Sequence, residues 1–412
     1  MQALRVAIFL AYKSIIKGNK STVFLIIFIL SLSFINLIFI SSILKGIVEA
    51  VDRQVINNLT SNIVIDPQEE PAIKDFILHA AETRREIENI PGVISTASHY
   101  KLSATLEYDK DKNNKFKVVS GEIVGINPEE EKLVTGVHKS MVAGRYLEGL
   151  GVEEIILGGD LAGGYGGEDL ISLGGVKVGD KVLLTFSNGV VRNYKVKGVF
   201  LARLGFVDRL AFITRQEAES ILPIYNNASQ ILVKIDASNG PNTAEVEQYY
   251  RDKIQSLFPN LKVRRWAEFL GAIANISKSF DVISSVVSAI GLAVAAITIF
   301  ILIYVNAVNK RRQIGILKAI GIKQNIIIGS YIIQALFYTL SGIIIGLILI
   351  FYLIEPYFFT HPLKLPIGDT YLALHAAGVI LSILSLLMAG LIAGFIPAWQ
   401  VAREDILKAI WG

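Results

Sequence analysis

The sequence contains no cysteine among its 412 residues, so no disulfide bond can hold a domain together, and any folded part must rely on burial of its core. The chain also lacks the Gly-x-x-x-x-Gly-Lys-Ser/Thr pattern of a P-loop, which cradles nucleotide phosphates. If ATP drives this protein, the ATPase must therefore be a different polypeptide.

Motifs of hydrolytic enzymes are missing as well. The sequence has neither His-Glu-x-x-His nor Gly-x-Ser-x-Gly, and the region between residues 45 and 281 holds only His79, His99 and His138. We interpret the acidic run at residues 129–131 as a solvated loop and not as a pair of catalytic carboxylates. We predict no catalytic residue, no metal site and no enzymatic activity for this chain.

Charge is absent from four long stretches, which contain no Asp, Glu, Lys or Arg: residues 23–44, 282–309, 326–354 and 370–402. Each exceeds the ~20 apolar residues that a helix needs to cross a membrane. The first stretch could instead be the core of a signal peptide, but it is longer than the usual ~7–15 residues and no small-residue cleavage site follows it. We therefore predict four transmembrane helices, the first a retained anchor.

The spacing of these stretches predicts one helix, a large α+β domain and then three more helices. The predicted segments are, in order, an N-terminal cytoplasmic segment (1–21), transmembrane helix 1 (22–44), the extracytoplasmic α+β domain with helical stalks (45–281), helix 2 (282–309), a cytoplasmic loop (310–325), helix 3 (326–354), an extracytoplasmic loop (355–369), helix 4 (370–397) and a cytoplasmic tail (398–412).

The orientation follows from the basic residues. Two short segments carry basic residues without any acid: Arg5, Lys13, Lys17 and Lys20 before the first span, and Lys310, Arg311, Arg312, Lys318 and Lys323 after the second. The positive-inside rule places both segments, and hence both termini, in the cytoplasm. Residues 45–281 hold 28 basic and 32 acidic side chains, a net charge of −4, so the basic excess is a topology signal and does not indicate a nucleic-acid partner.

Within the large domain, short alternating runs predict strands and longer periodic runs predict helices. The clearest feature is a hairpin of residues 181–186 and 190–200, joined by a turn containing Asn188-Gly189. Helices are predicted at 74–89, 243–257 and 267–278, and the Gly-rich run 158–167 is predicted to be a flexible loop. Residues 126–209 are predicted to form an inserted subdomain.

Residues 310–321 read Lys-Arg-Arg-Gln-Ile-Gly-Ile-Leu-Lys-Ala-Ile-Gly. This segment resembles the cytoplasmic loop of the MacB/FtsX-type family of ABC transporter membrane subunits, which includes the lipoprotein-releasing LolC/LolE permeases and the MacB exporters. Residues 123–128 with 144–147, 155–158 and 161–162, and the ending Pro-Ala-Trp-Gln-Val-Ala at 397–402, are similar to further parts of these permeases. Gln313 departs from the family, which commonly has Glu there.

The resemblance implies that the loop contains the coupling helix that docks on a cytoplasmic ABC ATPase, which uses ATP and Mg. Gly315 and Gly321 support a special role, because Gly costs ~1 kcal/mol inside a helix and is best placed at its end or against a partner. The residues predicted to couple to the ATPase are Arg312, Gln313, Ile314, Gly315, Leu317, Lys318, Ala319 and Gly321. A second permease copy or a paralogue is implied as a dimer partner.

Two Gly-x-x-x-Gly pairs in the spans predict close helix packing: Gly342 with Gly346, and Gly390 with Gly394. Polar residues inside the spans are few, namely Asn36, Asn306, Gln334 and His375, and only His375 is ionisable. An ion-coupled carrier would be expected to place ionisable groups there. The pattern favours a protein that handles its substrate outside the bilayer.

The sequence thus predicts a permease in the cytoplasmic membrane that uses mechanotransmission for efflux or lipoprotein release. Its cargo would be a lipoprotein, lipid, peptide or amphiphilic drug. Two alternatives remain: an FtsX-like signal transmitter that controls an extracytoplasmic partner without transport, and a membrane receptor that has no ATPase.

Overall fold

The computed structural model describes residues 2–68, 76–110, 116–149, 151–166, 171–222, 225–236, 243–365 and 368–403. The chain divides into two compact units. The helix bundle comprises residues 1–49, 277–364 and 369–412, and the large domain comprises residues 50–276 with 365–368.

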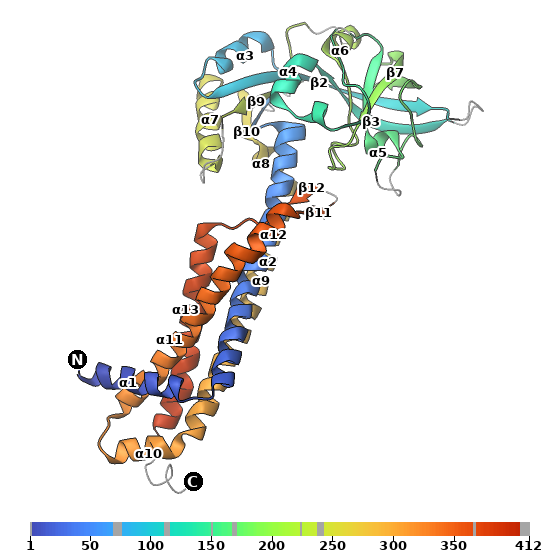
Figure 1. The fold of residues 1–412 in the computed structure, drawn as a ribbon. Helices are drawn as coiled ribbons and strands as arrows, with labels where there is room; N and C mark the ends of the chain where they lie inside the picture. The colour runs from blue at the N-terminus through green and yellow to red at the C-terminus, as the bar shows by residue number, and fades with distance from the viewer. Residues whose placement is uncertain are drawn as a thin grey trace. The chain divides into compact units, whose positions relative to one another are not determined.

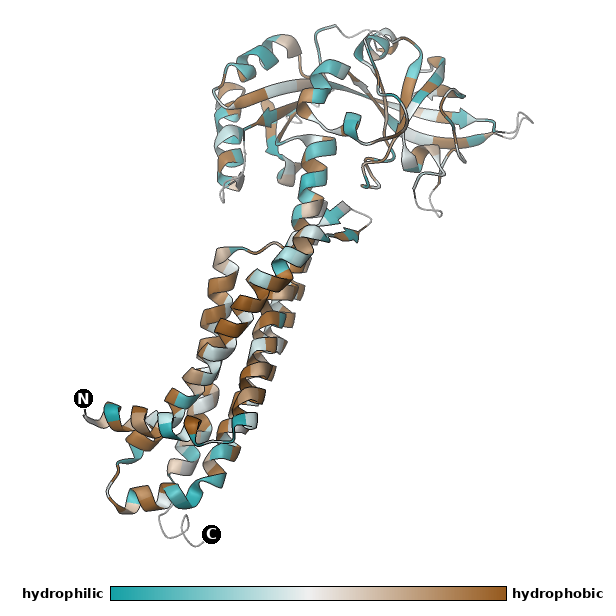
Figure 2. Ribbon diagram, in the orientation of Figure 1, coloured by the Kyte–Doolittle hydropathy of each residue, from teal (hydrophilic) through white to brown (hydrophobic). Residues whose placement is uncertain are grey.

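Four long helices run side by side in the bundle (Figure 1): α2 Lys20–Val55, α9 Gly271–Asn309, α11 Gln324–Leu349 and α13 Ala376–Ala402. Among the described residues, these helices are long and apolar enough to cross a membrane. Figure 2 colours most of the residues of these helices as hydrophobic. The predicted fold class, with one helix before the large α+β domain and three after it, is confirmed.

Shorter elements complete the bundle: α1 Gln2–Ile16, α10 Arg311–Ala319, a π-type turn Ile350–Ile354, α12 Glu355–Thr360, and the strands β11 Leu363–Leu365 and β12 Gly368–Thr370. Helix α1 was not predicted from the sequence, because it is too short to span a membrane and carries Arg5 and Lys13. Its Ala7 is buried, and a Cβ on Gly329 of α11 would lie 3.6 Å from the Ala7 Cβ.

The large domain is built on one sheet, whose strand order is β10-β1-β9-β2-β3-β8-β5-β7-β4, with β6 paired to β2 and β7. Its strands are β1 Ile63–Pro67, β2 Val93–Tyr108, β3 Lys117–Ile126, β4 Met141–Gly144, β5 Glu154–Gly158, β6 Lys181–Phe186, β7 Val191–Phe200, β8 Ala211–Thr214, β9 Gln230–Ile235 and β10 Leu261–Arg265. Only the pairs β3 with β8 and β5 with β7 are parallel among these described strands.

The helices of this domain are α3 Ala80–Glu88, α4 Pro128–Val134, α5 Gly159–Ala162, α6 Arg215–Ile221, α7 Thr243–Leu257 and α8 Trp266–Phe269, with a π-type turn Ile56–Thr60 and a 3-10 turn Val137–Lys139. Strand β2 spans 16 residues and pairs with strands in both parts of the sheet. Its first half pairs with β9 and its second half with β3 and β6. The predicted insertion at 126–209 stays a prediction.

The hydrophobic core follows this division of the sheet. One cluster includes Ile63, Ile87, Val233 and Ile254, which come from β1, α3, β9 and α7. A second cluster lies around β2, β3, β6 and β7 and includes Leu106, which is fully buried.

Three local predictions were wrong. The helix predicted at 74–89 begins only at Ala80, because Ile77 instead forms a β-bridge with Ala228; residues 69–75 lie outside the described part of the chain. In the Gly-rich run, residues 159–162 form α5 and pack Leu161 into the core. The acidic run at 129–131 is the first turn of α4, which Asn127 caps by accepting a hydrogen bond from the Glu129 backbone N–H.

Candidate functional site

Helix α10 carries most of the residues predicted to couple to an ATPase, and its end is sharply defined. Gly321 has φ +91° and follows the C-cap Ile320. The backbone N–H of Gly321 donates to the Lys318 carbonyl at 3.0 Å, and that of Ile322 donates to the Leu317 carbonyl at 3.1 Å. This pair of bonds is a Schellman motif, which requires the left-handed backbone that Gly adopts at little cost.

The apolar side chains of α10 divide between two faces. Ile314 is buried and Leu317 is half-buried, and both pack on the core of the bundle. Ile316 and Ile320 point the other way and are 49% and 71% exposed. Arg312 and Gln313 are exposed as well. The face available to a partner is therefore formed by Arg312, Gln313, Ile316 and Ile320, and we call it the α10 outer face.

The sequence pattern does not distinguish these two faces. Ile314 and Leu317 are among the residues predicted to couple to the ATPase, yet both side chains pack on the core of the bundle. Ile316 was not selected, although its large exposed apolar side chain is what a docking surface needs. Only the packing of α10 on its neighbours reveals the difference.

Helix α10 is tied to the end of α13. The Lys318 Nζ donates a hydrogen bond to the carbonyl oxygen of Ala402 at 3.0 Å. Close by in the sequence, the Arg403 guanidinium lies 4.0 Å from the centre of the Trp399 ring.

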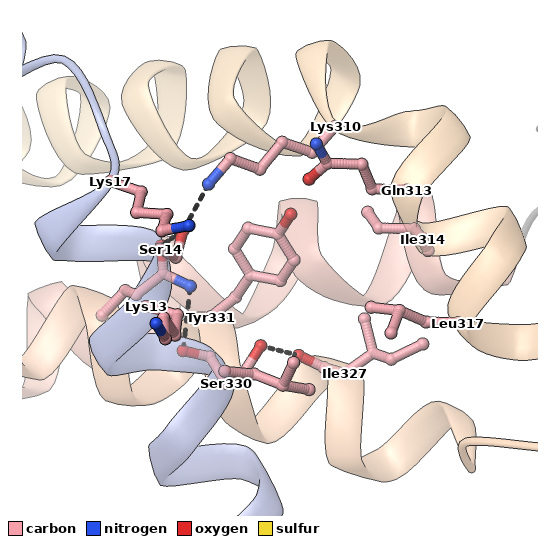
Figure 3. A pocket seen from close by; sticks show the side chains of 12 residues that line it. Lys13, Ser14, Lys17, Lys310, Gln313, Ile314, Leu317, Ile327, Ser330 and Tyr331 are labelled. Carbon is pink, nitrogen blue, oxygen red and sulfur yellow. Dashed lines mark hydrogen bonds between the residues drawn. The ribbon is translucent and has the colours of Figure 1, made fainter.

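Between α1, α10 and α11 lies a cavity of about 280 Å³ (Figure 3). Its lining residues are Leu10, Lys13, Ser14, Lys17, Lys310, Gln313, Ile314, Leu317, Ile327, Ser330, Tyr331 and Gln334. Lys310 Nζ donates to Ser14 Oγ at 2.5 Å, and Ser14 Oγ donates to Gln334 Oε1 at 3.0 Å. These bonds connect three segments that are far apart in the sequence.

Of the polar residues predicted inside the spans, Gln334, Asn306 and His375 have polar partners. Gln334 is almost fully buried; besides accepting from Ser14, it accepts from Asn306 Nδ2 at 3.4 Å and donates to the Ser330 carbonyl at 3.2 Å. His375 lies 3.3 Å from the Glu49 carboxylate and is 56% exposed. The bonds of Gln334 thus join α11 to α1 and α9.

The four glycines predicted to pack helices all lie at close helix contacts. A Cβ on Gly342 would stand 2.7 Å from Leu30 Cβ, and one on Gly346 would stand 2.6 Å from Phe34 Cδ1, so both glycines of α11 face α2. Both glycines of α13 face α11. A Cβ on Gly390 would stand 2.5 Å from Thr339 Oγ1, and a Cβ on Gly394 would stand 2.5 Å from Ala335 Cβ. Small residues at such sites let helix backbones approach closely.

In the large domain, Glu131 belongs to the acidic run that was predicted to be a solvated loop, but its side chain is buried. Glu131 is 1% exposed and lies 2.8 Å from His99 Nε2, while Thr135 Oγ1 donates to it at 2.7 Å. Burial raises the pKa of the Glu131 carboxyl, but the charge and hydrogen bond of His99 and the bond from Thr135 outweigh it, so the pKa lies below its usual value. The pair lines a cavity of about 200 Å³ together with Phe206, Phe269 and other residues.

The chain is similar to known permease proteins. Residues 285–406 match the family described as FtsX-like permease C-terminal, and this range includes α10 and all four packing glycines. A Staphylococcus haemolyticus protein, whose name assigns it as the permease protein HrtB of a hemin transport system, is 23% identical over 98% of this chain and 99% of that protein.

Two other relatives are longer. The macrolide export ATP-binding/permease protein MacB of Campylobacter jejuni is 29% identical over 34% of this chain, and the export protein SyfD of Pseudomonas syringae, named for syringafactin, is 25% identical over 34%. The chain spans about a fifth of the length of these relatives, 21% and 20%. Among solved structures, the periplasmic region of MacB from Actinobacillus actinomycetemcomitans aligns with 55% of this chain and 98% of that chain, at 12% identity and a TM-score of 0.37.

Proposed function

Because this chain belongs to the FtsX-like permease family and is a permease subunit of the MacB/FtsX type, we propose that it couples ATP hydrolysis by a separate cytoplasmic ATPase to movements of its large domain. The relative that matches over its whole length is named as a permease protein, and the longer relatives are named as ATP-binding/permease proteins. The ATP-binding part would thus be supplied by another chain.

The observation that carries this proposal is the α10 outer face. Two large apolar side chains, Ile316 and Ile320, are exposed next to the exposed Arg312 and Gln313, on a helix whose opposite side is anchored in the bundle. An exposed apolar patch with a polar rim is typical of a protein interaction site. We infer that this face docks on the ATPase and lies in the cytoplasm, with both termini on the same side.

The helices provide a mechanical link. Helices α2 and α9 contain 36 and 39 residues, more than the ~20 needed to cross a membrane. A continuous helix carries a tilt or shift at one end to the other, which is how packed helices transmit switching motions. Movement imposed on α10 would pass to α13 through the bond between Lys318 and Ala402.

We propose an amphiphilic cargo, such as a lipid, lipoprotein, peptide or drug, that the large domain handles outside the bilayer. The buried Gln334 and the half-buried Asn306 are hydrogen-bonded to each other, and Ser14 also donates to Gln334, so these amides provide no ionisable relay for an ion-coupled carrier. The hemin and syringafactin in the names of two relatives fit this class of cargo.

The proposal is tested by purifying the protein from its native membranes and identifying co-purifying proteins by mass spectrometry. An ABC ATPase in near-equal amount is expected, and cargo addition should change its hydrolysis rate. Recovery of the chain with an extracytoplasmic hydrolase and without an ATPase would contradict the proposal and favour the signalling alternative.

The docking face is tested with Ile320→Asp. Burying an Ile side chain in an interface contributes ~1.5–3 kcal/mol, so this variant should bind the ATPase roughly 10- to 100-fold more weakly. The matched control is Ile171→Asp, which makes the same change at a site that is 73% exposed in the large domain. Equal ATPase binding by both variants would show that α10 does not dock through this face.

A further inference from the structure

The cavity beside α1 gathers three ammonium groups. Lys13 lies in the last turn of α1 and Lys17 directly follows the helix, where its backbone N–H donates to the Lys13 carbonyl at 3.0 Å; both side chains line the cavity. Lys310 joins them from the segment that follows α9. Among the residues that the structure describes, no Asp or Glu lines this cavity.

The neutral partners within the cavity do not balance this charge. Lys310 donates to the hydroxyl of Ser14, and Lys13 and Lys17 are exposed toward solvent. Burial lowers the pKa of the Lys310 ammonium, because a charged group loses hydration there. An anion that entered the cavity would replace part of the lost hydration and reduce the repulsion among the three lysines.

Helix α1 indicates where such an anion would come from. Its Ala7 and Ala11 are buried, whereas its other side exposes large apolar residues: Leu4, Ile8, Phe9, Tyr12 and Ile16, each between 49% and 62% exposed. A helix with one apolar exposed side and lysines at its end is suited to lie in the interface of a lipid leaflet. The lysines would then stand at the depth of the lipid headgroups.

We propose that this cavity binds the phosphate of an anionic phospholipid headgroup, with the acyl chains of that lipid alongside the exposed apolar residues of α1. Lys13, Lys17 and Lys310 supply the positive charge and the N–H donors that a phosphate needs. A bound lipid would join α1 to α9 and α11, next to the inward-facing side of α10. A free phosphate ion could bind the same lysines, but it would make no contact with the exposed apolar residues of α1.

The test uses the full-length chain, without any ATPase, titrated with phosphatidylglycerol or phosphatidylcholine and analysed by native mass spectrometry for retained lipid. The variants are Lys13→Gln and Lys17→Gln, whose exposed side chains can be changed without disturbing the core. Each should weaken phosphatidylglycerol retention roughly fivefold, the effect of one lysine near an anionic surface. Retention of phosphatidylcholine should be unchanged.

The matched controls are Lys20→Gln and Lys323→Gln, which remove the same charge from exposed sites that do not line the cavity. Normal phosphatidylglycerol retention in both controls is expected. If the controls lose as much lipid as the cavity variants, or if the wild-type chain retains both lipids equally, the site is overturned. Displacement of phosphatidylglycerol by equimolar inorganic phosphate would assign the cavity to a soluble anion and equally overturn the lipid proposal.

Discussion

Replacing Gly342 by Ala should destabilise the contact between α11 and α2. An added Cβ would stand 2.7 Å from Leu30 Cβ and 3.2 Å from backbone atoms of Leu30 and Ser31. Ordinary van der Waals contact begins near 3.4 Å. These neighbours are backbone and Cβ atoms, so no rotamer change can make room, and the two helices must move apart.

The change in the free energy of unfolding depends on two opposing effects. Ala is favoured over Gly inside a helix by ~1 kcal/mol, whereas overpacking a well-packed contact costs ~1–3 kcal/mol. Gly329→Ala provides the matched control on the same helix, because its Cβ would lie 3.6 Å from Ala7 Cβ, an ordinary contact. The propensity term is common to both variants, so Gly342→Ala should be ~1–3 kcal/mol less stable than Gly329→Ala.

The assay is equilibrium unfolding of the full-length chain in mixed detergent micelles, with the helical circular dichroism signal as readout. We expect the Gly329→Ala midpoint to lie at or slightly above that of the wild type, and the Gly342→Ala midpoint to be clearly lower than that of Gly329→Ala. Equal stability of the two variants would refute the reasoning, because it would mean that α2 and α11 do not approach closely at residue 342.

Two further predictions concern other parts of the chain. Gly321 has a φ of +91°, so Gly321→Ala should destabilise the C-terminal end of α10 by ~1–2 kcal/mol. Amide hydrogen exchange of residues 317–322 should then become faster. Unchanged exchange would contradict the Schellman motif at this helix end. The lowered pKa of Glu131 means that its ionised form stabilises the large domain above pH ~4.5, the ordinary value, and that this stability is lost as the pH falls through the folded-state pKa. Glu131→Gln should cost ~1–3 kcal/mol at neutral pH and weaken that acid dependence; an acid transition identical to that of the wild type would refute this account.

Sequence reasoning was most reliable where composition alone decides the structure. The four uncharged stretches and the hairpin at Asn188-Gly189 are local signals, and the backbone there follows them: the Phe186 N–H donates to the Val190 carbonyl at 2.9 Å, and Gly189 has φ +85°. The positions of β6 and β7 were found for the same reason. Strand β8 was not predicted, because it has only four residues, all buried, and shows no alternation.

The rest depends on tertiary contacts that a single sequence does not display. Glu131 belongs to an acidic run that is typical of a solvated surface, and only its pairing with His99, 32 residues earlier, explains its burial. Ile316 and Leu317 are adjacent and chemically alike, yet one faces solvent and the other the bundle. Helix α1 was missed because its buried side consists of two alanines, which give a weak apolar pattern.

The central claim is that the α10 outer face contacts a cytoplasmic ATPase. Because the chain has no cysteine, Ile320→Cys introduces a unique thiol, to which a short thiol-to-amine cross-linker can be attached in native membranes. The account predicts a cross-linked product containing an ABC ATPase, and no such product from the control Ile171→Cys in the large domain. An ATPase product from Ile171→Cys and none from Ile320→Cys would contradict both the docking face and the proposed orientation.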